Sequence, residues 1–225
     1  VDVKFLTPDQ VKEIWPLCNT SDLVGAIQHP EDGYIQPADL TQALATGARN
    51  RGAEIYRNTN VVGIKQTKNG WVVETDKGSI ECEHVMSCSG NFARQTGKMV
   101  GLEIPVIPVE HQYIVTEPHP EIQKRKKEGL PEMGVLRDSD SRWYMREEAG
   151  GLILGPYEDG APCCYVDGPS KDSEYELFQE DLDRLAPHIE GAIHRVPAFG
   201  EVGVKKVYNG AICYTPDGNP IVGPA

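Results

Sequence analysis

The sequence contains no long apolar run and few aromatic residues. Phe, Trp and Tyr together make up 7% of the 225 residues. No segment approaches the ~20 consecutive apolar residues that cross a bilayer as a helix. We therefore expect no membrane partner. A chain of this length can bury a sizeable core, in one large domain or two small ones.

Positive charge is also scarce. The chain has 22 Lys and Arg against 34 Asp and Glu, which gives a net charge of −12 at pH 7. Nucleic acids and anionic membranes both select for basic patches, so we expect neither as a partner. The basic cluster KRKK at 124–127 lies in this acidic background, and we interpret it as the solvated face of a helix.

Cysteine pairs at metal-binding spacing are absent. None of the six cysteines forms a C-x-x-C pair, and two of them are adjacent, which is a poor geometry for bridging each other. We interpret all six as thiols in a reducing compartment, such as the bacterial cytoplasm or the mitochondrial matrix. Neither a disulfide framework nor a metal site is expected. The six are Cys18, Cys82, Cys88, Cys163, Cys164 and Cys213.

Apolar spacing and turn residues predict an α/β (α+β) chain. Thr7, Pro8 and Gln10 form a capping box that opens a first helix. Further helices are expected at 37–51, 91–101 and 173–188. Strands are expected at 53–57, 61–67, 71–75, 79–83, 84–90, 106–117, 142–148 and 151–155, and strand and turn over 202–223. The change of character near Pro105 predicts a small second domain at about 105–200, inserted between pieces of an α/β domain.

The strand VIPVEHQYIVTE, residues 106–117, carries a histidine at its centre. Because side chains alternate along a strand, His111 and Tyr113 share the apolar face, whereas Gln112 and Thr116 share the other. One reading is a hydrogen-bonded core histidine, since an unsatisfied buried imidazole costs about 1–3 kcal/mol. The other is a face that lines a ligand pocket, with a neutral histidine as hydrogen-bond partner or base.

A second candidate lies in the hairpin SRWYMREEAGGLILGPYE, residues 141–158, which turns at 149–151. Tyr144 falls between Arg142 and Arg146 on one strand face. A tyrosine flanked by arginines can bind a carboxylate substrate. A solvated strand face explains the same pattern.

The segment SCSG, 87–90, joins an expected strand to an expected helix through small residues. Backbone amides at such a turn can point at a bound anion or a ring edge. The signal is weak by itself, because the segment lacks the G-x-G-x-x-G spacing, and an ordinary turn between a strand and a helix explains it more simply.

Five segments together resemble the flavin-dependent amine oxidoreductases of the D-amino-acid-oxidase type. Within that type, they look most similar to dimethylglycine and sarcosine dehydrogenases. They are DGYIQPADLTQALATGARNRGAEI (32–55), SCSGNFARQTGKMVGL (87–102), PVIPVEHQYIVTE (105–117), GVLRDSDSRWYMREEAGGLILGPYE (134–158) and YTPDGNPIVGP (214–224). The resemblance covers almost the whole chain. It implies a partial FAD-binding domain, 1–104 and 201–225, and an inserted antiparallel-sheet substrate-binding domain, 105–200.

The resemblance also implies a reaction. FAD takes a hydride from the N-methyl carbon of a small N-methylated amino acid, dimethylglycine or sarcosine. The carbon then leaves as formaldehyde or passes to folate bound in a C-terminal half that lies beyond these residues. His111 matches a residue facing flavin and substrate, as partner or base for the amine, and Tyr144 matches an orienting hydroxyl. Arg146 is our own candidate for the substrate carboxylate.

Cofactor contacts are likewise implied by the resemblance. The residues that match them are Val62 at the adenine end, Ser89 and Gly90 near the flavin, and Gly210, Pro216 and Asp217 on the isoalloxazine side.

The sequence departs from the family in three places. Gln36 replaces the aspartate that usually precedes Pro37, and residues 88–93 replace an Ala-Ala-Gly-x-Trp-Ala pattern, which bears on substrate preference and flavin contacts. The G-x-G-x-x-G turn that holds the pyrophosphate is found nowhere in the chain. We therefore expect an internal piece of a longer protein that binds FAD weakly or not at all by itself. Two other functions fit the sequence: a non-catalytic relative like the regulatory subunit of pyruvate dehydrogenase phosphatase, and an acidic binding module for a small anion.

Overall fold

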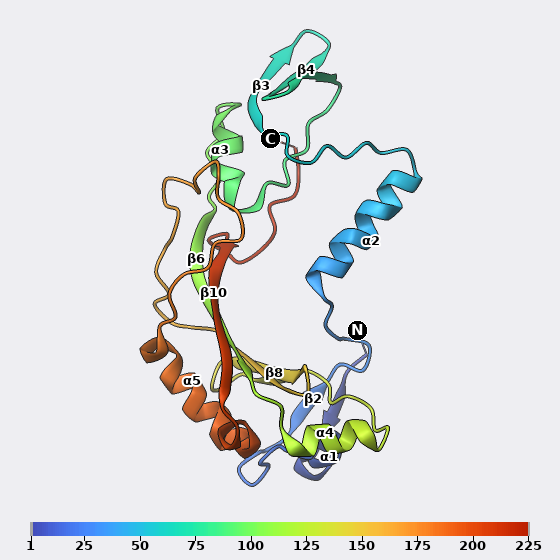
Figure 1. Ribbon diagram of the computed structural model, residues 1–225, viewed down its shortest axis with the longest axis vertical. Coiled ribbons are helices and arrows are strands. Elements are labelled where there is room, and N and C mark those ends of the chain that lie inside the picture. The colour runs from blue at the N-terminus through green and yellow to red at the C-terminus, as the bar shows by residue number, and fades with distance from the viewer. Residues whose placement is uncertain (1, 225) are drawn as a thin grey trace. The chain divides into compact units, whose positions relative to one another are not determined.

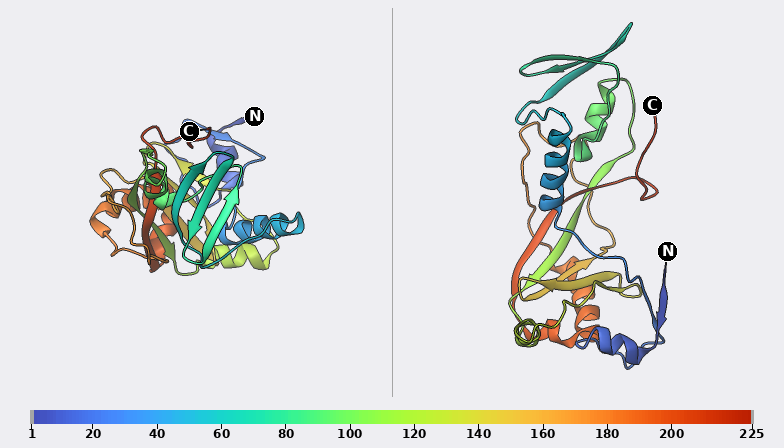
Figure 2. Two further views of the ribbon diagram at one scale, coloured as in Figure 1. Left: turned by 90° about the horizontal axis from the view of Figure 1, so that it is seen from above. Right: turned by 90° about the vertical axis from the view of Figure 1, so that its right-hand side faces the viewer.

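The computed structural model describes residues 2–224, which divide into two compact units. Unit 1 takes the chain up to Tyr34 together with 110–162 and 175–211, and unit 2 takes 35–109, 163–174 and the chain from 212 onward. Figures 1 and 2 show the elements of each unit. The assignment of 105–200 to substrate and of the flanking parts to cofactor concerns binding and stays a prediction.

Unit 1 is built on an antiparallel sheet with the strand order β10-β6-β9-β8-β7. The strands are β6 (Ile107–Thr116), β7 (Leu136–Asp138), β8 (Trp143–Glu148), β9 (Gly151–Pro156) and β10 (Val204–Tyr214). The expected strands at 106–117, 142–148 and 151–155 are confirmed, and so is the turn between β8 and β9. Their β-rich composition and the tight Ala149-Gly150 turn explain this success.

Further helices and two short strands complete unit 1. They are β1 (Lys4–Leu6), α1 (Pro8–Ile14), β2 (Ala26–Gln28), α4 (Pro120–Lys127), α5 (Leu182–Arg195) and the 3₁₀ turn η2 (Pro197–Glu201). The capping box is confirmed: the Thr7 hydroxyl accepts from the Gln10 amide, and the Gln10 side chain accepts from the Thr7 amide.

The helix expected at 173–188 is wrong in its first half. α5 begins only at Leu182, where the Asp181 carboxylate caps it by accepting from the Arg184 amide at 3.1 Å. Before that point the chain pairs with β10: Leu177 bridges Gly210, and the Phe178 amide donates to the Asn209 carbonyl. These non-local backbone bonds replace those that a helix would have made.

The core of unit 1 lies against one face of the sheet. Trp143 and Met145 on β8, Leu152 and Leu154 on β9, and Ile114 on β6 are all fully buried there. The expectation that the apolar face of β6 is the one with His111 and Tyr113 was wrong as a guide to the core, because the face with Gln112 and Thr116 is the core face. Gln112 and Thr116 are buried on it with Ile114, and their polar atoms are satisfied by hydrogen bonds.

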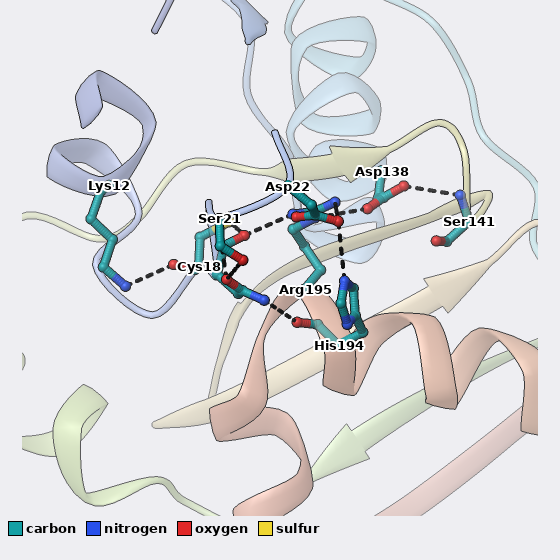
Figure 3. Close-up of polar contacts among 9 residues, drawn as sticks. Lys12, Cys18, Ser21, Asp22, Asp138, Ser141, His194 and Arg195 are labelled. Carbon is teal, nitrogen blue, oxygen red and sulfur yellow. Dashed lines mark hydrogen bonds and ion pairs between the residues drawn. The ribbon is translucent and has the colours of Figure 1, made fainter. Parts of the chain in front are cut away.

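A buried arginine ties distant parts of unit 1 together (Figure 3). Arg195, near the end of α5, donates to Asp138 at 3.1 Å and to Asp22 at 2.5 Å. It also donates to the Asn19 carbonyl at 2.7 Å. Arg195 and His194 hold the pKa of the Asp22 carboxyl well below its usual range. The cluster fixes the segment around residues 19–22 to α5 and β7.

Unit 2 contains a three-stranded antiparallel sheet, β3-β4-β5, seen in Figure 2. Its elements are α2 (Pro37–Asn50), β3 (Val61–Thr67), β4 (Gly70–Thr75), β5 (Gly78–Cys82), the 3₁₀ turn η1 (Gly90–Phe92) and α3 (Ala93–Lys98). The helix expected at 37–51 and the three meander strands are confirmed, and the expected helix 91–101 is shorter.

The strands expected at 53–57 and 84–90 do not form. Both segments are rich in apolar residues, yet neither pairs with another strand within residues 2–224. A strand needs a neighbour to satisfy its backbone groups, so composition alone did not produce one here. Ile55 and Met86 are correspondingly exposed, at 42% and 88%.

Candidate functional site

The histidine of the 106–117 strand lies at the centre of β6 and is half-buried. It projects from the face opposite to the core, because Ile114 on the core face alternates with Tyr113 and His111. Burial lowers the pKa of the imidazole, and the charge of Glu158 opposes this only in part. His111 therefore favours its neutral form, which can accept a proton or a hydrogen bond.

Tyr144 projects from β8 on the same side of the sheet. Its neighbours along the strand, Trp143 and Met145, fill the core face, so Tyr144 points the other way. It pairs in register with Gly155 on β9, and its ring lies in tilted contact with Tyr157, with 6.0 Å between ring centroids. The sheet thus brings His111 and Tyr144 to one face.

Arg146 shares this face, but its charge is already paired. Its Nη1 atom donates to the Glu148 carboxylate at 2.5 Å and to the Glu147 carbonyl at 2.8 Å. The guanidinium also stacks over the ring of Tyr34, 4.1 Å from its centroid. A substrate carboxylate would have to compete with Glu148 for it. Arg142 is turned away from the strand by a positive φ of 54° and pairs with Asp159 at 2.6 Å.

An aromatic pair beside His111 was not assigned a role from the sequence. Tyr113 on β6 stacks on Tyr208 of the neighbouring strand β10, with 4.8 Å between centroids and 19° between ring planes. Burial raises the pKa of Tyr113, and the nearby Tyr208 and Tyr144 add to the effect. Strand alternation could have identified Tyr113, because it lies two residues after His111 and therefore on the same face. No sequence pattern linked Tyr208 to this face, because it lies far along the chain.

A buried polar network lies on the other side of β6. The backbone N–H and the side-chain Nε2 of Gln112 donate to the two carboxylate oxygens of Glu158, each at 2.8 Å. Arg184 then donates to Glu158 at 2.9 Å and pairs with Glu110 at 3.3 Å. These bonds satisfy groups that would be costly to bury alone, and they fix the strand that carries His111.

In unit 2, Val62 lies at a β-bulge in β3. The register with β4 shifts between Val61 and Gly63, so that Val62 has no partner in the ladder. Its side chain is 61% exposed. A bulge turns the backbone of its extra residue away from the partner strand, as the expected backbone contact with an adenine requires.

Ser89 and Gly90 lie where the chain enters η1. Gly90 has φ of +53°, a conformation that favours glycine, and the Ser87 and Ser89 hydroxyls are 2.8 Å apart.

Pro216 and Asp217 form a turn held by hydrogen bonds. The Asp217 carboxylate accepts from the Asn219 amide and the Thr215 hydroxyl, and these bonds lower its pKa. Pro216 lines a cavity of about 460 Å³ with Arg94, Glu103, Ile104, Pro105, Ile107, Tyr214 and Thr215. Gly210 belongs to unit 1, on β10, where it bridges Leu177.

Residues 2–224 contain neither a metal site nor a membrane-spanning helix. No group of His, Cys, Asp or Glu there could hold a metal ion, and no cysteine there forms a disulfide. No helix in this range is both long and apolar enough to cross a bilayer.

The chain is similar over almost its whole length to several curated proteins. It is 39% identical over 226 residues to mitochondrial dimethylglycine dehydrogenase of Rattus norvegicus, covering 98% of this chain and 26% of that protein. It is 34% identical over 231 residues to mitochondrial sarcosine dehydrogenase of Mus musculus, covering 100% of this chain and 24% of that protein. It is also 34% identical to the mouse mitochondrial pyruvate dehydrogenase phosphatase regulatory subunit, covering 98% of this chain and 25% of that protein. The chain therefore spans about a quarter of the length of these relatives.

Solved structures agree on the fold. The L-proline dehydrogenase from P. horikoshii matches 99% of this chain and 56% of its own, with a TM-score of 0.81 and 27% identity. The family described as DAO, FAD dependent oxidoreductase, matches residues 1–225. The chain belongs to this family of FAD-dependent oxidoreductases.

Proposed function

We propose that the protein containing this chain oxidatively demethylates an N-methylated glycine, dimethylglycine or sarcosine. The observation that carries the proposal is the single sheet face of unit 1 that gathers His111, Tyr144 and the Tyr113–Tyr208 pair. The similarity to dimethylglycine and sarcosine dehydrogenases supports this substrate class.

The reaction requires a neutral amine, because the nitrogen lone pair must form the new C=N bond as a hydride leaves the N-methyl carbon. His111, kept neutral by burial, accepts the ammonium proton. Tyr144 orients the amine through its hydroxyl, and the Tyr113 ring offers an aromatic surface to the positive charge that develops on nitrogen. Water then adds to the iminium carbon, and formaldehyde and the demethylated amine leave. Transfer of that carbon to folate is the alternative fate.

FAD accepts the hydride when bound. The residues of unit 2 fit such a group, because Val62 stands outside its ladder and the Gly90 turn is open, with no atom within 4 Å of an added methyl group. We propose that Val62, Ser89, Gly90, Gly210, Pro216 and Asp217 contact the cofactor. Arg146 is proposed to hold the substrate carboxylate by exchanging Glu148 for it.

The test is to mix the full-length protein anaerobically with dimethylglycine and then with sarcosine. The absorbance of the flavin is monitored during each reaction. Bleaching with one of them supports the proposal and names the substrate. Formaldehyde, assayed with and without tetrahydrofolate, shows where the carbon goes. His111→Ala and Tyr144→Phe are expected to slow bleaching on the order of 10²-fold while flavin is retained.

Two matched variants control for general damage. His29→Ala removes an exposed histidine, and Tyr175→Phe changes a tyrosine that is 97% exposed. Both should bleach at the rate of the unmodified protein. If they slow it as much as the site variants do, the assignment of His111 and Tyr144 fails.

A regulatory function is the second candidate, because the regulatory subunit of pyruvate dehydrogenase phosphatase matches nearly the whole chain. A bound flavin that stays oxidised with both substrates would favour it. A protein without any flavin would favour the anion-binding module.

A further inference from the structure

Gly155 occupies the centre of the face that carries His111 and Tyr144. It lies on β9, the strand between β6 and β8. Its partner on β8 is Tyr144. On the β6 side, the pairs Ile114 with Leu154 and Val115 with Ile153, continued by one residue, set Tyr113 opposite Gly155. A residue without a side chain thus separates two tyrosines.

The space above Gly155 is filled by Tyr144. A methyl group built on Gly155 would overlap two ring carbons of Tyr144, Cζ and Cε1, and its hydroxyl oxygen. The tip of the ring therefore lies across β9, on the side of the sheet where β6 carries His111 and Tyr113. The electrostatic influence of Tyr144 on Tyr113 is consistent with this reach.

Gly151, at the start of β9, differs. A methyl group on Gly151 would meet the backbone oxygen of Glu117, so that substitution would disturb strand pairing. At Gly155 the three nearest atoms all belong to the end of one side chain, which can swing away about its side-chain torsions. Substitution at 155 should move the ring and leave the sheet intact.

We propose that Gly155 is the positioning residue for Tyr144: its missing side chain lets the ring lie across β9 and hold its hydroxyl toward the strand of His111. The assignment of a reaction to this face rests on the proposed function, whereas the coupling between Gly155 and Tyr144 does not. An alanine at 155 would displace the hydroxyl from the substrate, and a misplacement of about 1 Å can cost on the order of 10²-fold in rate.

The experiment is a double-mutant cycle in the full-length protein with Gly155→Ala, Tyr144→Ala and the combination. Flavin reduction by the substrate and the thermal midpoint are both measured. We expect Gly155→Ala to slow reduction nearly as much as Tyr144→Ala does. In the Tyr144→Ala background the same change should alter the rate and the midpoint by much less, because the overlapping ring is gone.

Two glycine variants separate positioning from general destabilisation. Gly134→Ala adds a methyl group into open space and should leave rate and midpoint unchanged. Gly151→Ala should lower the midpoint whether or not Tyr144→Ala is also present, because its clash is with the backbone. If Gly155→Ala fails to fold alone, recovery of folding in the combination still demonstrates the coupling.

The outcomes are distinct. Additive effects of Gly155→Ala and Tyr144→Ala on both readouts would overturn the positioning role, even in an active enzyme. A non-additive midpoint in a protein that oxidises neither substrate would support the seating of the ring and reject the proposed function. Non-additivity in both readouts supports the whole inference.

Discussion

The two units differ in how much apolar surface they bury. All fifteen members of the buried hydrophobic cluster belong to unit 1, including Trp143, Met145 and Leu154. Among the described residues of unit 2, Ile64 and Val106 are buried, at 8% and 9% exposure, and the ring of Pro108 is fully buried. Hydrophobic burial is the dominant favourable term in folding, so unit 1 carries most of the stability.

The difference matches the chemistry that each unit is proposed to perform. Unit 1 holds side chains at fixed places, and a dense core with satisfied polar networks keeps His111 and Tyr144 in position. Unit 2 presents exposed backbone and apolar groups, such as Val62 at 61% exposure. Such a surface suits a large flat ligand, and binding would contribute stability that the unit lacks by itself.

The largest expected difference in stability is between the removal of a tryptophan from unit 1 and the removal of one from unit 2. Trp143→Ala deletes a fully buried side chain in unit 1 and should cost about 3–5 kcal/mol in the free energy of unfolding. Trp71→Ala in unit 2 removes a partly exposed ring on β4 and should cost about 1 kcal/mol. Urea unfolding of the full-length protein, followed by circular dichroism, measures both. Equal losses would contradict the contrast.

Ion pairs sharpen the same contrast. Arg195→Met leaves Asp138, whose side chain is 9% exposed, without its charged partner and should cost about 3 kcal/mol. Lys65→Met breaks a pair with Glu74 whose side chains are 67% and 36% exposed, and should cost less than about 1 kcal/mol. The unfolding free energies should separate the two variants, and 1 M salt should diminish only the smaller effect.

Hydrogen exchange would measure the contrast residue by residue. Amides of β3, β4 and β5 should exchange faster than those of β8 and β9, because fewer buried contacts hold the β3-β4-β5 sheet. FAD at about 100 times its Kd should stabilise the binding-competent state by about 2.7 kcal/mol and slow the exchange in unit 2. Riboflavin, which lacks the adenine, serves as the control ligand. Protection confined to unit 1 would contradict the cofactor assignment.

The sequence predicted the elements whose determinants are local. The capping box at Thr7 and the meander from 61 to 82 rest on caps and tight turns within a few residues. The expected strand 53–57 failed because it pairs with no strand within residues 2–224. The first half of the helix expected at 173–188 failed because its backbone bonds to β10, which lies further along the chain.

The candidate site was predictable to the same extent. Alternation along β6 and β8 placed His111 and Tyr144 on particular faces of their strands, but it could not tell which face of β6 meets the core. Gly155 is a glycine within a strand, a pattern typical of a close approach. Only the register with β8 shows that the approaching group is the ring of Tyr144.

The smallest effect concerns the protonation of His111. Burial lowers its pKa below the ordinary value of about 6.5. The unfolded chain therefore binds the proton first as the pH falls, so the stability contributed by neutral His111 is present above about pH 6.5 and declines below it. The rate of flavin reduction should fall only at a lower pH, where the folded protein protonates this histidine. Histidine-labelled protein followed by NMR gives the midpoint, with His111→Gln identifying the resonance. A midpoint at or above about 6.5 would show that Glu158 outweighs burial and that the face stays charged when an amine arrives.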